Sequence, residues 1–137
     1  MKAEIRNVDG LTMMGRADSN HWVVMDASED HNGAGAGATP MEFVLMALGG
    51  CLAMTVKSLL SKKRLDVGQM TVELDAQTAG ENPHVFTSVD VLLRFRGGQL
   101  TGDDVAWAVD LARKKYCPVD AMIERTAQVN CSWDVEV

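Results

Sequence analysis

The longest apolar segment of the chain covers residues 43–56, where only two glycines and one threonine interrupt the hydrophobic side chains. Just before it, Thr39, Pro40 and Glu42 match a helix start with a Thr-x-x-Glu capping box and proline in the first turn. A helix that is apolar on every side is buried. Because about 14 apolar residues are fewer than the ~20 that span a membrane, the pattern predicts a buried central helix that ends near residue 63.

Segments that alternate between apolar and polar residues flank this helix and predict strands. Turn sequences separate neighbouring segments, and the turn at residues 80–83 predicts a β-hairpin. The expected strands are residues 1–7, 11–17, 21–26, 70–78, 84–96 and 129–137.

Two further helices are expected in the second half of the chain. One covers residues 103–116, where acidic residues come first and basic residues last, as the helix dipole favours. Pro118 begins a short third helix that runs to about residue 125. The apolar stripe of the longer helix consists of Val105, Ala108, Val109, Ala112 and Tyr116.

The resulting order, β-β-β-α-β-β-α-α-β, predicts an α+β fold in which the buried central helix packs against a largely antiparallel sheet. No repeat, low-complexity segment or composition shift divides the chain, so residues 1–137 are expected to form a single domain. One sheet covers only one side of an all-apolar helix. We therefore expect a homodimer with C2 symmetry, in which a second copy covers the other side.

Charge and cysteine content narrow the function classes. A net charge of -6 argues against nucleic acid as a partner, since phosphate backbones require clustered lysine and arginine. The first ten residues lack the apolar segment of a secretion signal, and three cysteines are an odd number for a disulfide framework. Both observations favour a reducing, cytoplasmic location, with no membrane partner.

Each cysteine has a different predicted environment. Cys131 alternates with Val129 and Trp133 on the apolar face of the last strand, so we expect an inert core side chain. Cys51 lies within the central helix after two glycines. It is either another packed core thiol or a thiol beside which another part of the protein approaches the bare backbone.

Cys117 immediately precedes Pro118 at the predicted start of a helix, where backbone N–H groups stabilise a thiolate. Arg113 and Lys114 could add positive charge one turn upstream. Asp120 works in the opposite direction, because a nearby carboxylate raises the pKa of a thiol.

Metal and cofactor sites are not expected. The cysteine spacings match no common ligand pattern, and His21, His31 and His84 are expected in solvated positions. The glycines at residues 33–37 lack the spacing of a phosphate-binding loop.

Taken together, the capped Thr-Pro-x-Glu helix start, the small residues before Cys51 and the later Cys117-Pro118-Val119 resemble the OsmC/Ohr family of osmotically inducible and organic-hydroperoxide-resistance proteins. The resemblance covers essentially the whole chain. It implies an OsmC-like fold, an intertwined homodimer and active sites at the subunit interface. It also implies that Cys51 is the peroxidatic thiolate, that Cys117 forms a disulfide with it, and that an external dithiol reduces the enzyme.

The family's peroxidases also use an arginine from the N-terminal strands and a glutamate directly after the proline. Arg16 is the closest match to the arginine, whereas Met41 occupies the glutamate position and the carboxylate is Glu42. Nine residues at ~100° each place Glu42 on the opposite helix face from Cys51. Glu42 therefore acts across the dimer or serves only as the capping-box partner.

Two functions follow from this resemblance. The first is a thiol-dependent peroxidase that reduces alkyl or fatty-acyl hydroperoxides, with Cys51, Cys117, Arg16 and Glu42 as site residues. The alternative is a non-enzymatic dimer of the same fold that binds apolar ligands or senses redox state.

Overall fold

The computed structural model describes residues 1–137, which form two compact units, Met1–Val44 and Leu45–Val137. Each unit contains one three-stranded sheet. Three of the four strand pairings are antiparallel and the fourth is parallel, so the expected α+β fold is confirmed, although the strands form two sheets and not the single sheet expected. The single-domain organisation stays a prediction.

The N-terminal unit is built on an antiparallel sheet with the order β1-β2-β3. A long loop with one short 3-10 helix, η1 (Glu29–His31), follows β3 and is anchored by the buried carboxylate of Asp26. That carboxylate accepts hydrogen bonds from the Thr12 hydroxyl at 2.7 Å and from the backbone N–H groups of Ala27 and Ala36. The strands are β1 (Ala3–Asp9), β2 (Thr12–Ala17) and β3 (Val23–Met25).

The central helix α1 (Pro40–Lys62) begins as the sequence predicts. The Thr39 hydroxyl accepts from the Glu42 N–H at 3.2 Å, and the Glu42 carboxylate accepts from the Thr39 N–H at 3.3 Å. By length and composition alone, α1 could cross a membrane. Its buried leucines, however, belong to the same core as the sheet of the C-terminal unit.

In the single chain, α1 is buried on one side and exposed on another, as expected for a helix that one sheet covers. Leu48, Leu52 and Leu60 are buried, whereas Met46 is 51% and Met54 is 71% exposed. Within the C-terminal unit, the single sheet covers one side of the helix.

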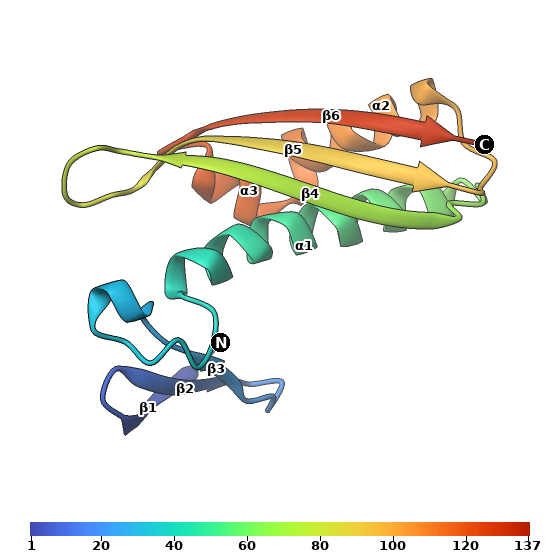
Figure 1. The fold of residues 1–137 in the computed structure, drawn as a ribbon. Helices are drawn as coiled ribbons and strands as arrows, with labels where there is room; N and C mark the ends of the chain where they lie inside the picture. Colours follow the sequence, from blue (N-terminus) through green and yellow to red (C-terminus); the bar gives the residue numbers. More distant parts are fainter. The chain divides into compact units, whose positions relative to one another are not determined.

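The C-terminal unit places helices on one face of a sheet with the order β4-β5-β6 (Figure 1). Strands β4 and β5 form the predicted hairpin, while β6 pairs with β5 in parallel. The inward side chains of β5 form the centre of the core, which confirms the predicted alternation. The strands are β4 (Gln69–Thr78), β5 (Phe86–Arg96) and β6 (Gln128–Glu136).

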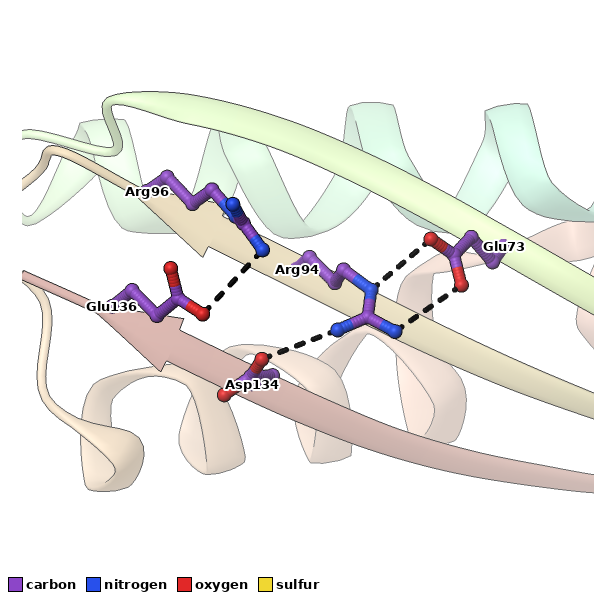
Figure 2. A network of polar contacts seen from close by, with 5 residues as sticks. All are labelled: Glu73, Arg94, Arg96, Asp134 and Glu136. Carbon is purple, nitrogen blue, oxygen red and sulfur yellow. Dashed lines mark hydrogen bonds and ion pairs between the residues drawn. The ribbon is translucent and has the colours of Figure 1, made fainter.

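Charged side chains cover the outer face of this sheet (Figure 2). Arg94 on β5 contacts Glu73 on β4 through two hydrogen bonds and Asp134 on β6 through a third. Beside it, Arg96 pairs with Glu136 at 3.4 Å. These ion pairs follow the strand register and are solvated, so each is worth at most about 1 kcal/mol.

The helix predicted over residues 103–116 changes character before its end. Helix α2 (Gly102–Leu111) continues into a π-helical turn, η2 (Ala112–Tyr116), and α3 (Pro118–Ile123) follows. The Cys117 N–H donates to the Ala112 carbonyl at 2.8 Å, which closes the wider turn. As a result Tyr116, expected on the apolar stripe, is 48% exposed, and Cys117 is buried instead.

Candidate functional site

The fold brings together two thiols that are 66 residues apart in the sequence. Cys51 lies within α1, and Cys117 lies between the π-helical turn and α3. The Cys117 thiol donates a hydrogen bond to the Cys51 sulfur, with 2.9 Å between the two Sγ atoms. Both cysteines are free. The proximity expected for these thiols is therefore present.

Backbone contacts fix the position of Cys117. Its N–H is held by the π-helical turn, and Pro118 begins α3 directly after it. Cys117 is the N-cap of α3, and its Sγ accepts from the Asp120 N–H at 3.4 Å. The side chain is only 3% exposed. Cys117 therefore presents its thiol to Cys51 rather than to solvent.

The environment of Cys117 favours the protonated form. Burial is the main cause that raises the pKa of the Cys117 thiol to about 12, and its hydrogen bond to Cys51 raises this pKa further. The negative charge of Asp120 acts in the same direction, whereas the Asp120 N–H opposes it. The expectation that the helix start stabilises a Cys117 thiolate is therefore wrong. Helix α3 has only six residues, and desolvation raises the pKa of the thiol more than the N–H group of Asp120 lowers it.

A buried ion pair lies next to this thiol. Asp120 is 0% exposed, and its Oδ2 accepts from the Arg113 Nε at 3.0 Å. Arg113 also donates from Nη2 to the Val129 carbonyl at 2.8 Å, which links the π-helical turn to β6. The second carboxylate oxygen of Asp120, Oδ1, has no hydrogen-bond partner.

The sequence indicates that Arg113 and Asp120 have separate, opposite effects on the pKa of the Cys117 thiol. It does not predict that the two side chains form an ion pair. Seven residues separate them, and a regular helix ending before Cys117 gives no reason for them to meet. The signal available in the sequence was a basic residue before Cys-Pro and an acidic residue three positions after the cysteine. The two side chains come into contact in a structure where the helix ends in a π-helical turn, which the sequence pattern does not predict.

Cys131 lies on β6, partly buried, on the side of the sheet that carries the core. Burial raises the pKa of its thiol, and the nearby Arg113 lowers it in part. Cys131 also lines a pocket of about 400 Å³ together with Arg113 and Trp133. The inertness of Cys131 stays a prediction.

The two glycines before Cys51 do not serve the approach of Cys117, which corrects that interpretation. A Cβ added at Gly49 would meet the Leu74 side chain of β4 at 2.6 Å, so Gly49 allows α1 to lie close to the sheet. A Cβ added at Gly50 would meet nothing within 4 Å. The structure gives no reason for the second glycine.

The remaining predicted site residues, Arg16 and Glu42, lie in the N-terminal unit. Arg16 on β2 forms an ion pair with Glu4 at 3.2 Å and packs on the Trp22 ring at 4.7 Å. Glu42 is the capping-box partner of Thr39, as one of its two interpretations requires. Action of Arg16 or Glu42 on Cys51 stays a prediction.

No three His, Cys, Asp or Glu side chains are grouped as a metal site.

Comparisons with known proteins show the family of this chain. The OsmC-like protein family matches residues 32–132. Protein YhfA of Escherichia coli strain K12 is 38% identical over 135 residues, which cover 98% of each chain.

Two solved structures share the fold at lower identity. A hypothetical protein from Aquifex aeolicus VF5 has a TM-score of 0.86 at 23% identity, covering 98% of this chain and 94% of its own. An organic hydroperoxide resistance protein OsmC from Legionella pneumophila has a TM-score of 0.74 at 14% identity, covering 99% and 96%. Because the family match covers most of the sequence and a relative aligns over nearly all of both chains, this chain belongs to the OsmC-like protein family.

Proposed function

We propose that the protein is a thiol-dependent peroxidase that reduces organic hydroperoxides. The single observation that carries the proposal is the hydrogen bond from the Cys117 thiol to the Cys51 sulfur at 2.9 Å. This bond orders the pair: Cys117 holds its proton, and Cys51 presents an electron pair. It also places the second sulfur where it can attack the first once that sulfur is oxidised.

The reaction divides into two steps. The Cys51 thiolate attacks the distal peroxide oxygen, the O–O bond breaks, and the alkoxide takes a proton and leaves as the alcohol. Cys51 is then a sulfenic acid. Cys117 attacks its sulfur, the S–S bond forms, the S–O bond breaks, and water leaves. An external dithiol reduces the disulfide by exchange, which fits a reducing cytoplasmic location.

The substrate class is inferred from the exposed apolar side chains of α1, the helix that carries Cys51. Met46 and Met54 are exposed on the same helix, so an alkyl or fatty-acyl chain has apolar surface to contact. Hydrogen peroxide has no group that benefits from such a surface. The relative from Legionella pneumophila, named as an organic hydroperoxide resistance protein, supports this choice.

We assign to Arg16 the electrostatic stabilisation of the Cys51 thiolate. Arg16 matches the arginine that the family's peroxidases take from their N-terminal strands, and it is already oriented by Glu4. Glu42 is given no catalytic step, because its carboxylate is engaged in the helix cap.

The test is a titration of the reduced protein with cumene hydroperoxide. One equivalent of peroxide should consume two thiols per chain, as a sulfenic acid resolved to a disulfide requires. Consumption of no thiol would contradict the peroxidase. Consumption of one thiol would contradict resolution by Cys117.

We also propose that the protein acts as a homodimer. Met46 and Met54 on α1, and Ile5 and Val8 on β1, leave apolar side chains in solvent in a single chain. Large apolar side chains exposed in this way are typical of surfaces that a partner covers. Sedimentation equilibrium should give about twice the 14.9 kDa chain mass. A stable, folded 14.9 kDa species would contradict the dimer.

Cys131 is assigned no part in the chemistry. Cys131→Ser should leave the rate of hydroperoxide consumption within about three-fold of wild type, because serine is only slightly smaller than cysteine and its hydroxyl replaces a thiol that takes no part in the reaction. Loss of activity in a variant that keeps its circular dichroism spectrum would show that Cys131 is a reacting thiol.

A second candidate function is supported by a different observation. The N-terminal unit contains an apolar pocket of about 360 Å³, lined by Leu11, Met13 and Met25 among others. A protein that only binds apolar ligands would use such a pocket and would leave both thiols reduced in the cumene hydroperoxide titration. That outcome would favour the binding function over the peroxidase.

A further inference from the structure

The buried carboxylate of Asp120 has one oxygen that the fold leaves unused. Oδ2 is satisfied by Arg113 at 3.0 Å, but Oδ1 has no donor although the side chain is fully buried. A buried polar atom without a hydrogen-bond partner destabilises the fold, because it has lost its hydration and gained no donor. The ion pair with Arg113 uses only Oδ2. It does not explain why the second oxygen, Oδ1, is buried without a donor.

The position of Asp120 next to Cys117 explains the unpaired oxygen. Asp120 is three residues after Cys117 in the first turn of α3, and its N–H already contacts the Cys117 Sγ at 3.4 Å. A side chain three positions after the N-cap residue folds back toward it in a capping box. Here the Cys117 N–H is taken by the Ala112 carbonyl, so the carboxylate is not used as a backbone cap.

The attack of Cys117 on oxidised Cys51 requires a proton acceptor, and Oδ1 of Asp120 is an acceptor without a donor. In the reduced protein, the Cys117 proton is directed at the Cys51 sulfur. Once Cys51 carries an oxygen, Cys117 must lose that proton to become a nucleophile. Burial and neighbouring charge hold the pKa of the Cys117 thiol near 12, so its spontaneous ionisation at neutral pH is rare.

We infer that Asp120 is the proton acceptor that activates Cys117 for attack on oxidised Cys51. This assignment rests on the proposed peroxidase and concerns its second step. The Cys117 proton passes to Asp120 Oδ1, the S–S bond forms, and the S–O bond of the Cys51 sulfenic acid breaks. The departing hydroxide then takes the proton from Asp120 and leaves as water, which returns the carboxylate to its starting state.

The charged and titratable groups around Asp120 fit this role. Arg113 on the π-helical turn donates a hydrogen bond to Oδ2 and fixes the orientation of the carboxylate. Cys51 on α1, Cys131 on β6 and Glu124 at the end of α3 are the other titratable groups close to the Asp120, Arg113 and Cys117 cluster. Arg113 is therefore a positioning residue, and Asp120 is the group that exchanges the proton.

The experiment separates the second step from the first. In a Cys131→Ser background, one equivalent of 5,5′-dithiobis(2-nitrobenzoate) converts Cys51 into a mixed disulfide, and peptide mass spectrometry verifies the labelled residue. Attack by Cys117 then expels the coloured thionitrobenzoate, whose release is followed from about pH 6.5 to 8.5. This exchange needs no hydroperoxide, so its outcome does not depend on the peroxidase activity.

With Asp120 as acceptor, the wild-type release rate should change little over this pH range. Asp120→Asn keeps the shape and should slow release on the order of 100-fold at pH 7. The rate of the variant should then rise roughly tenfold per pH unit, as expected when hydroxide must ionise the thiol. Asp120→Ser provides a second neutral variant, and Glu124→Gln is the matched control that removes a nearby carboxylate and should leave the rate unchanged.

Three results would overturn the inference. The first is a wild-type rate that itself rises tenfold per pH unit, which decides the matter even if neither Asp120 variant folds. The second is an Asp120→Asn rate and pH profile equal to wild type. The third is initial labelling at Cys117 instead of Cys51. Normal exchange in a protein that ignores organic hydroperoxides would instead contradict the peroxidase and leave the role of Asp120 supported.

Discussion

Replacement of Cys51 by serine should abolish the consumption of organic hydroperoxides. A serine hydroxyl does not ionise near neutral pH and lacks the nucleophilicity of a thiolate toward the O–O bond. Cys117 cannot take over, because burial raises the pKa of its thiol to about 12 and keeps it protonated. Peroxide loss measured by the ferrous–xylenol orange assay should fall to the rate of buffer alone.

A thermal unfolding experiment is the control that the Cys51→Ser variant is folded. Cys51 is packed at the edge of the core, and serine is slightly smaller, so thermal unfolding should remain cooperative. Residual turnover above a few per cent in well-folded Cys51→Ser would assign the nucleophile to another thiol.

Replacement of Cys117 by serine should separate the two chemical steps. The first equivalent of peroxide should still be consumed, because Cys51 is intact, but catalytic turnover through the disulfide should stop. The Cys51 sulfenic acid then has no resolving thiol at 2.9 Å and should accumulate. Dimedone labelling followed by mass spectrometry should give one adduct per chain, located on Cys51.

The same labelling on wild type provides the comparison. Wild type should give almost no dimedone adduct, since the disulfide forms before the reagent reacts. An adduct of equal yield in wild type and Cys117→Ser would mean that Cys117 does not resolve the sulfenic acid, whatever its distance from Cys51.

The parts of the fold that could be predicted are those fixed by local pattern. The alternation in β4 and β5 depends only on which side chains face the core, and the start of α1 depends on Thr39, Pro40 and Glu42 within four residues. The parallel pairing of β6 with β5 could not be predicted in this way. An alternating strand presents the same faces whichever direction its neighbour runs.

Other features depended on contacts that no local pattern encodes. The π-helical turn brings Arg113 to Asp120, and the same residues in a regular helix would lie apart. The glycines at 49 and 50 were associated with Cys117, although Gly49 accommodates Leu74 from β4. The resemblance to the family identified the pair Cys51 and Cys117, while the ion pair of Arg113 with Asp120 beside it became visible only in the fold.

The central claim is that Cys51 and Cys117 act as one redox pair, and disulfide mapping tests it most directly. Reduced protein is treated with one equivalent of tert-butyl hydroperoxide, free thiols are alkylated, and the peptides are analysed by mass spectrometry without reduction. The account predicts a disulfide between Cys51 and Cys117, with Cys131 alkylated. A disulfide between Cys51 and Cys131, or three alkylated thiols after exposure to the peroxide, would contradict it.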